Sequence, residues 1–103
     1  MPSSANICYR TMSYADLPAV MAVELRAYPF PWTEGIFINC LHSGYMMHVA
    51  TLGHEIVGYG VLSAAAGEAH VLNLCVDPHR QKLGIGTRLL DILLEHASRQ
   101  GAE

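Results

Sequence analysis

Two glycines separated by one residue, Gly84 and Gly86, stand in the segment HRQKLGIGTRLL (residues 79–90), between a basic run and an apolar stretch with helical spacing. Glycine costs about 1 kcal/mol against alanine inside a helix, so the pair marks the place where a helix begins. The first N–H groups of a helix have no acceptor within it, and together with the helix dipole they bind anions. Glycine there allows unusual backbone dihedrals and close approach of a ligand. The segment therefore predicts an anion site.

Three cations surround the glycine pair: Arg80, Lys82 and Arg88. Beside two glycines at a helix start, they favour contact with a pyrophosphate over a merely solvated basic face. The P-loop pattern GxxxxGKS/T is absent from the sequence, and Leu89 stands where the dinucleotide-binding fingerprint needs a third small residue. A pair of glycines alone is a weak signal. Its position after an apolar strand and before an amphipathic helix strengthens the prediction.

Hydrophobic periodicity predicts the elements that position this site. Alternating or continuous apolar runs indicate four strands, and apolar residues at helical spacing indicate three helices. The strands are expected over 7–12, 45–52, 55–65 and 68–77, and the helices from a cap at Ser13 or Asp16 to Pro29, over 34–42 behind a Thr33 cap, and over 84–100. The order is a strand, two helices, a three-stranded meander and a helix, which predicts an α+β domain.

Two of these elements carry expectations about burial. The first helix is expected to bury Met21, Leu25 and Tyr28. The apolar run from Val71 to Val76 predicts a central strand that is buried on both faces. A central strand followed by a crossover helix normally leads to a parallel partner strand.

Composition bounds the class of protein. The chain has 103 residues, 51% of them hydrophobic and 15% charged, which predicts one folded domain. A net charge of −3 argues against nucleic acid as a direct partner. No apolar run approaches the roughly 20 residues of a membrane span, and the N-terminus does not resemble a signal peptide. Three cysteines without a CxxC pair predict reduced thiols in a cytoplasmic protein, and six histidines without ligand spacing predict no metal site.

The segment QKLGIG matches the Q/R-x-x-G-x-G/A signature of the GNAT (GCN5-related N-acetyltransferase) family, with Gln81, Gly84 and Gly86 at the signature positions. The resemblance runs from YRTMSYADLPAVMAVE through the helix ending at Gln100, and so covers nearly the whole chain. Within the family, YPFPWT and LNLCVDPHRQKLGIGTRLL most resemble the RimI-type enzymes. These enzymes acetylate the N-terminal alanine of a small-subunit ribosomal protein, so the resemblance implies that protein as the acceptor.

The resemblance implies a GNAT-type mixed, mostly antiparallel sheet with helices on both faces. It also implies a binding site for acetyl-CoA as cosubstrate. In that site, the end of the third meander strand offers backbone groups to the pantetheine arm and the acetyl carbonyl, while the glycine loop wraps the pyrophosphate. The strand residues are Leu74, Cys75 and Val76, and the loop residues are Lys82, Leu83, Gly84, Ile85, Gly86 and Thr87.

On the acceptor side the sequence leaves several alternatives open. Phe30 and Trp32 either line a groove for a peptide substrate or cap the core. Glu24 either faces the incoming amine or, as the favoured interpretation, is a solvated helix residue. Asn73 is expected to satisfy a backbone group rather than to touch substrate. Cys75 is expected to be a small core thiol rather than a nucleophile.

In RimI-type enzymes the catalytic glutamate and tyrosine follow the glycine-loop helix, and the resemblance places both beyond Glu103. Residues 1–103 are therefore interpreted as a single partial acetyltransferase domain that lacks the C-terminal strands and helix, with its catalytic residues unknown. The open edge of the last strand predicts self-association. A catalytically silent acyl-CoA-binding module, and an acetyltransferase acting on a small amine or a lysine, stay open as alternatives.

Overall fold

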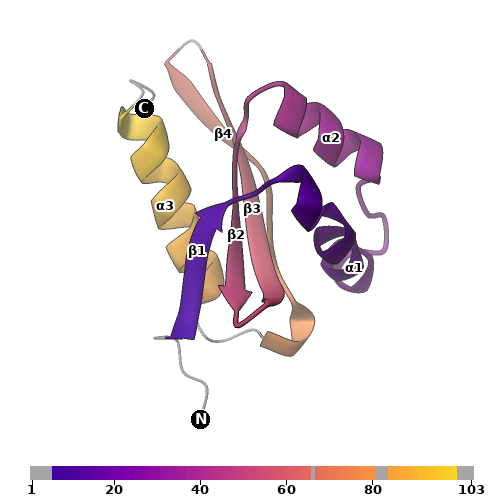
Figure 1. Cartoon of the computed structure of the whole chain (residues 1–103). Helices are drawn as coiled ribbons and strands as arrows, with labels where there is room; N and C mark the ends of the chain where they lie inside the picture. Colours follow the sequence, from indigo (N-terminus) through magenta and orange to yellow (C-terminus); the bar gives the residue numbers. More distant parts are fainter. Residues whose placement is uncertain (1–5, 66, 81–83, 100–103) are drawn as a thin grey trace.

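The computed structural model describes residues 6–65, 67–80 and 84–99 (Figure 1). In chain order its elements are β1 (Ile7–Thr11), the 3₁₀ turn η2 (Tyr14–Asp16), α1 (Leu17–Ala27), α2 (Glu34–His42), β2 (Met46–Leu52), β3 (Glu55–Ala65), β4 (Glu68–Val76), the 3₁₀ turn η3 (Pro78–Arg80) and α3 (Ile85–Arg99). Every strand and helix expected from the periodicity is present, in the expected order. Within the described part of the chain, no helix has the length and apolar content needed to cross a bilayer.

The four strands form one sheet in the order β1-β2-β3-β4, and each pair of neighbours is antiparallel. The β2–β3 turn places Gly53 at a φ of +64°, a left-handed conformation that glycine adopts without strain. The β3–β4 pairing is irregular: Val61 lies opposite Asn73 and Leu62 opposite Val71, so Leu72 has no partner on β3. This extra residue is a β-bulge.

Helices cover both faces of the sheet (Figure 1). On one face, Val20 and Val23 of α1 and Phe37 of α2 pack with Tyr59 of β3 in the largest core cluster. On the other face, α3 contributes two smaller core clusters. Their α3 members are Ile85, Leu89, Leu93 and Ala97. The mostly antiparallel sheet with helices on both faces is therefore confirmed, and the described pairings are all antiparallel.

Two glycines of β3 let α3 approach the sheet. A Cβ at Gly58 would lie 3.1 Å from Ile85 Cγ2, and a Cβ at Gly60 would lie 2.6 Å from Leu93 Cδ1. Because protein interiors are close-packed, larger residues here would displace the helix. Gly58 thus fixes where the first residue of α3 sits relative to the sheet.

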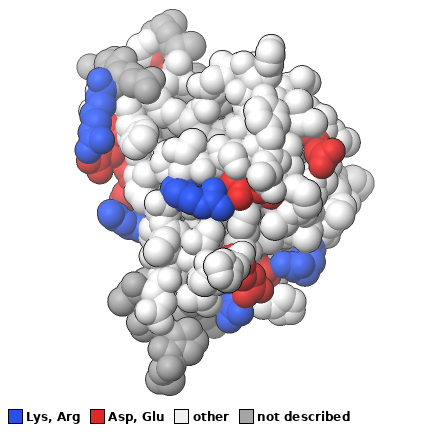
Figure 2. Space-filling model, in the orientation of Figure 1, with Lys and Arg blue, Asp and Glu red and all other residues white. Residues whose placement is uncertain are grey.

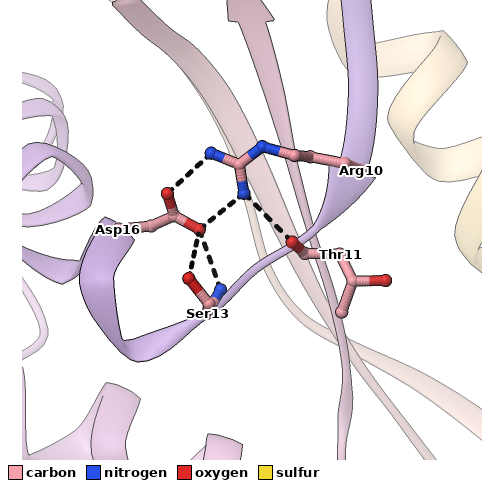
Figure 3. A network of polar contacts seen from close by, with 4 residues as sticks. All are labelled: Arg10, Thr11, Ser13 and Asp16. Atoms are coloured by element: carbon pink, nitrogen blue, oxygen red, sulfur yellow. Dashed lines mark hydrogen bonds and ion pairs between the residues drawn. The ribbon is translucent and has the colours of Figure 1, made fainter. Parts of the chain in front are cut away.

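A polar network joins β1 to the start of α1 (Figure 3). The guanidinium of Arg10 donates to both carboxylate oxygens of Asp16, at 2.8 and 2.7 Å, and the N–H of Ser13 donates to Asp16 at 2.8 Å. These bonds, the one from Arg10 foremost, lower the pKa of Asp16 to about 2 despite its burial. Ser13 and Asp16 form a capping box on η2, so both residues expected to cap the first helix lie at its entry.

The buried face of α1 differs from the prediction. Leu25 is 62% exposed, whereas Val23 and Glu24 are buried, and Met21 and Tyr28 are partly buried. The helix begins at Leu17, and the residues that follow it at helical spacing, rather than Leu25, face the sheet. The prediction for Leu25 was wrong because the buried stripe of α1 passes through Val23 and Glu24, so the next residue along the helix turns toward solvent.

The prediction that the apolar run of β4 is buried on both faces was also wrong for the first residues of that run. Val71 and Leu72 are 46% and 41% exposed, while Asn73 and Cys75 are buried. Two features explain the difference. Among the described strands β4 has a neighbour on one side only, and the bulge at Leu72 interrupts the regular alternation of side chains.

Candidate functional site

The glycine pair lies at the first turn of α3. Gly84 has a φ of +73° and precedes the helix directly, and a Cβ there would meet nothing within 4 Å. Conformation rather than lack of space therefore requires glycine at this position. The carbonyl of Gly84 accepts from the N–H of Arg88 at 3.1 Å, which makes it the first acceptor of the helix. By helix geometry, the N–H groups of Ile85, Gly86 and Thr87 have no acceptor within the helix.

Gly86 lies against the end of β4. A Cβ on it would be 3.5 Å from Val76 Cγ2, an ordinary contact. The first turn of α3 therefore sits beside the last residue of the strand, and Thr87 and Arg88 are exposed next to it. The helix start and the strand end form one continuous surface.

The three cations expected around the loop differ in what the structure shows of their contacts. Arg80 forms an ion pair with Glu55 at 3.0 Å, a contact that the sequence did not predict. For Arg88 the described residues provide no ion pair. Lys82 and Leu83, together with Gln81 of the signature, lie outside the described residues.

The outer edge of β4 presents backbone polar groups. The N–H of Asp77 donates to the carbonyl of Val57 at 2.8 Å. This bond shows which residues at the end of β4 turn their backbone groups toward β3 and which turn them away. By the alternation of an antiparallel ladder, the N–H and C=O groups of Cys75 point toward β3, whereas those of Leu74 and Val76 point away from it. The hydroxyl of Tyr28 donates to the carbonyl of Leu74 at 3.2 Å, in agreement with this direction.

A pocket of about 380 Å³ opens between α1, the loop that follows it, and β4. Its lining residues come from these three segments: Glu24, Tyr28, Phe30, Trp32, Val71, Leu72, Asn73 and Leu74. Phe30 and Trp32, the two residues proposed from the sequence to line a peptide groove, are among them. Trp32 also packs edge-on against Phe37, with ring centroids 5.1 Å apart, so it touches both the pocket and the core.

Glu24 is the buried centre of this pocket. It is 1% exposed, and its carboxylate accepts three hydrogen bonds. The donors are the Tyr59 hydroxyl, the Asn73 amide at 3.1 Å and the Trp32 N–H at 2.9 Å. The favoured interpretation of Glu24 as a solvated residue was wrong, because its position on α1 faces β4 rather than solvent. A buried carboxylate persists only with such partners.

The sequence contained a signal for this residue. Glu24 lies four residues after Val20 and seven after Leu17, on the stripe that faces the sheet. An acidic residue on an apolar stripe indicates a buried polar partner. Tyr28 continues the same stripe, and Asn73 meets it from β4. Neither Tyr28 nor Asn73 was assigned to a site from the sequence.

Two tyrosine hydroxyl groups are held in their neutral form: that of Tyr28, which lines the pocket, and that of the fully buried Tyr59, which donates to Glu24. Burial raises the pKa of Tyr28 to about 12, with the nearby Cys75 adding to the effect. Burial also raises the pKa of Tyr59, and its hydrogen bond to Glu24 raises it further. Both tyrosines therefore act as hydrogen-bond donors at neutral pH. Tyr28 lies 3.2 Å from the Asn73 side-chain oxygen as well as from the Leu74 carbonyl.

Cys75 lies behind the pocket as a buried, free thiol. Burial raises its pKa, which keeps it protonated and unreactive. The interpretation of Cys75 as a core thiol is therefore confirmed. The described residues contain no group of three or more His, Cys, Asp or Glu residues placed to hold a metal ion.

An ion pair ties α1 to the end of β4. Arg26 donates to Asp77 at 2.6 Å, and Asp77 is buried. Burial alone would raise the pKa of Asp77, but the hydrogen bonds from the His79 N–H and from Arg26 lower it. Through Glu24, Arg26 and the C-cap residue Tyr28, α1 is thus anchored along β4 up to the turn that leads to the glycine loop.

Basic side chains on the face shown in Figure 2 lie beside acidic ones rather than in a single basic field. Arg10, Arg26, Arg80 and Arg99 each pair with a carboxylate. A large patch of one sign is the electrostatic footprint of nucleic-acid binding. On that face the basic side chains do not gather into such a patch.

Comparison with known proteins places the chain in a family. Residues 17–103 match the model of the acetyltransferase (GNAT) family. The chain belongs to this family. The helix start at Gly84 and Gly86, beside the end of β4, therefore occurs here within a GNAT domain.

Several GNAT proteins resemble the chain in sequence. The ribosomal protein bS18-alanine N-acetyltransferase of Escherichia coli (strain K12) is 30% identical over 91 residues, which cover 88% of this chain and 62% of that protein. An uncharacterized N-acetyltransferase of Methanocaldococcus jannaschii is 32% identical over 91 residues, which cover 82% of this chain and 54% of that protein. The chain thus spans less than two thirds of the length of these relatives.

Solved structures share the fold. The crystal structure of the ribosomal-protein-S18-alanine N-acetyltransferase from Escherichia coli matches with a TM-score of 0.85 and 28% identity, over 93% of this chain and 62% of that one. An N-acetyltransferase from Thermoplasma acidophilum in complex with coenzyme A matches with a TM-score of 0.82 and 18% identity, over 92% of this chain and 74% of that one. At that identity the second match shows the fold alone.

Proposed function

We propose that this chain carries the donor site of an acetyl-CoA-dependent N-acetyltransferase that acts by direct transfer on the N-terminal amine of a protein. The proposed acceptor is the N-terminal alanine of a small-subunit ribosomal protein. The observation that carries the proposal is the glycine-led start of α3 beside the outward-facing edge of β4. Membership of the GNAT family and the similarity to the bS18-alanine N-acetyltransferase support it.

The donor would bind along this surface. The N–H groups of the first turn of α3 would hold the pyrophosphate, with Gly84 shaping the turn and Arg88 adding positive charge. Leu74 and Val76 would offer outward backbone groups to the pantetheine arm. The same expectation for Cys75 was wrong, because its backbone groups turn toward β3, and it would only keep the strand in register. Lys82 and Leu83 belong to the same proposed loop.

Transfer would proceed by attack of a neutral amine on the thioester carbonyl carbon. The new C–N bond forms, the C–S bond breaks, the amine's proton passes to a base, and the leaving thiolate takes a proton from an acid. A backbone N–H of the β4 edge would polarise the carbonyl and stabilise the developing negative charge. We propose that the base and the acid are a glutamate and a tyrosine beyond Glu103.

The pocket on the other side of β4 would receive the acceptor. Phe30 and Trp32 line it, and Glu24 places a carboxylate beneath them. A carboxylate attracts an ammonium group and repels an acidic substrate. A cytoplasmic setting belongs to the same proposal, supported by the free thiols of the three cysteines.

Self-association through the outer edge of β4 is part of the proposal: among the described strands β4 has a neighbour on one side only, and an open strand edge is a template for another chain. Sedimentation velocity over a range of concentrations tests it. A concentration-dependent dimer is expected, and a monomer at every concentration would contradict it.

Because the proposed base and acid lie beyond Glu103, the function is tested with a longer protein that contains this chain and those residues. That protein is incubated with acetyl-CoA and a peptide that begins with alanine. Mass spectrometry should show one acetyl group on the free N-terminus and none on a peptide whose N-terminus is blocked. Acetylation of a small amine or of a lysine instead would support the alternative acceptor classes. Binding of acetyl-CoA without any transfer would identify a silent acyl-CoA-binding module. Absence of binding would contradict the proposal.

A further inference from the structure

His48 is a buried histidine on β2 whose polar groups are not all satisfied. It is 7% exposed, and its Nδ1 atom is buried without a hydrogen-bond partner. Buried polar atoms in folded proteins are nearly always paired, so an unpaired one calls for a reason. The side chain takes no part in the donor surface or in the pocket described above.

The ring of His48 meets a second imidazole, which comes from α3. The ring centroids of His48 and His96 are 4.9 Å apart, and the two planes are inclined by 81°, an edge-to-face arrangement. His96 is partly buried and lies near the C-terminal end of the helix. About 50 residues separate the two histidines in the sequence, so no local spacing rule connects them. The pair is a direct contact between the sheet and the C-terminal half of α3.

The strands beside β2 bring no charge to this pair. Thr11 of β1 and Gly60 of β3 lie opposite His48 in the register. Further along β1, burial raises the pKa of the Tyr9 phenol and keeps it neutral.

The helix brings no neutralising charge either. In the described chain no ion pair includes His48 or His96, and Glu95 pairs with Arg99 instead. The charged residues of α3 are all exposed: Arg88, Asp91, Glu95 and Arg99. A proton on the pair would therefore have no carboxylate partner among the described residues.

The two halves of α3 are held on the sheet by separate groups of side chains. Ile85 and Leu89 of the first half belong to a core cluster with residues of β1, β2 and β3. The second half contributes Leu93 and Ala97, which share a smaller cluster with Leu62 of β3. The second half can therefore leave the sheet without disturbing the packing of the first turn.

We propose that His48 and His96 form a pH-sensitive latch, which holds the C-terminal half of α3 (residues 93–99) on β2 while both imidazoles are neutral and releases it when the pair takes up a proton. The latch acts on the end of α3 that lies away from the glycine loop. It does not depend on the reaction that the protein catalyses.

The direction of the pH effect follows from the chemistry of imidazole. The neutral ring has one donor and one acceptor nitrogen, whereas the protonated ring has two donors and a charge. Burial lowers the pKa of His48, and His96 lowers it further. In the released form His48 meets water and regains its ordinary pKa of about 6.5. Release therefore becomes more favourable as the pH falls below about 6.5. For one histidine that is protonated only in the released form, the opening equilibrium rises up to about tenfold between pH 7.5 and pH 5.5.

The test measures amide hydrogen exchange of the chain at pH 7.5 and pH 5.5 by NMR. Each rate is divided by that of an unstructured peptide at the same pH, so the chemical pH dependence of exchange cancels. Opening at residues 93–99 should rise roughly five- to tenfold at the lower pH. Small amounts of urea should leave this exchange unchanged, because a local opening exposes little surface, whereas amides of β3 that exchange through global unfolding should accelerate.

Three substitutions at the latch and one control identify the groups responsible. His48→Gln and His48→Met should both reduce the pH-dependent change to less than about twofold, and His96→Gln should reduce it in part. His42→Gln is the matched control, because it removes an exposed histidine at the end of α2 and should keep the full change. Circular dichroism at pH 7.5 should show all variants folded.

Several results would overturn the latch. One is exchange at residues 93–99 that accelerates with urea as the β3 amides do, since the opening would then be global. Another is a folded His48→Gln or His48→Met variant that keeps the full pH-dependent change. A His96→Gln variant that behaves as the parent would show that the two histidines do not act as a pair.

Discussion

The side-chain amide of Asn73 donates to Glu24 at 3.1 Å and thereby joins strand β4 to helix α1 beneath the pocket. The bond connects the two elements that carry the proposed donor and acceptor surfaces. The outward backbone groups of Leu74 follow Asn73 directly on β4. The carboxylate of Glu24 lines the pocket in which the proposed function places the acceptor amine. A change in this contact should therefore affect stability and substrate binding together.

Glu24→Ala is expected to destabilise the fold by about 2–4 kcal/mol, because it leaves the Tyr59 hydroxyl, the Asn73 amide and the Trp32 N–H without their acceptor in a buried site. Glu24→Gln retains one side-chain oxygen and should cost less. Urea unfolding at neutral pH measures both. Glu34→Gln, an exposed residue at the start of α2, is the control and should change stability by less than about 0.5 kcal/mol. Equal stability of Glu24→Ala and the parent would contradict the network.

Asp16 should make the fold sensitive to strong acid. Its pKa in the folded protein is about 2, below the ordinary value of 3.8, so the carboxylate stabilises the fold at neutral pH. The stabilisation is lost as the pH falls from about 4 toward 2. We expect about 1–2 kcal/mol, reduced from the full linkage value because the Arg10 side chain is half exposed. The stability difference between the parent and Asp16→Asn should shrink over that range, and a constant difference would argue against the ion pair.

His48 should add a second, milder pH dependence. It is buried on β2 against His96 of α3, with ring centroids 4.9 Å apart. Burial lowers its pKa, and the neighbouring His96 lowers it further. The unfolded chain then binds a proton more readily, so stability falls as the pH drops below about 6.5. In His48→Gln the loss between pH 7.5 and pH 5.5 should be smaller. An identical loss would show that His48 does not titrate on unfolding.

Much of the fold follows from local sequence rules. Thr33 caps α2 as predicted, with its hydroxyl accepting from the Ile36 N–H at 3.3 Å, and Gly84 adopts the left-handed backbone that its position before α3 suggested. These features depend on a few adjacent residues. The errors concern packing between distant segments.

Glu24 and Leu72 show why those errors arose. A glutamate on a helix is usually solvated, and only the tertiary contacts with Tyr59, Asn73 and Trp32 make its burial favourable. Leu72 lies in an apolar run that resembles a central strand, yet a bulge in the pairing with β3 leaves it exposed. The position of a bulge depends on the pairing with the neighbouring strand, so it cannot be predicted from the apolar run alone.

Gly84→Val should abolish coenzyme binding with only a modest loss of stability. A Cβ at Gly84 would meet open space, so the cost lies in the left-handed backbone, about 1–2 kcal/mol or somewhat more for a β-branched residue. The turn would have to change its dihedrals and misplace the N–H groups of α3. Gly44→Val is the matched control, because Gly44 also has a left-handed φ of +78° and open space around a Cβ but lies before β2, away from the loop. That variant should lose a similar amount of stability and keep its affinity for the coenzyme. Unchanged affinity in Gly84→Val would mean that the loop does not bind the pyrophosphate.

The most direct test of the donor site is a calorimetric titration of the folded chain with acetyl-CoA, with ATP as the competing phosphate ligand. We expect saturable binding of acetyl-CoA that ATP at the same concentrations does not reproduce, because the pantetheine arm would also contact the backbone of β4. Absence of binding by a chain shown to be folded by circular dichroism, or equal binding of both ligands, would contradict the assignment of this surface to coenzyme A.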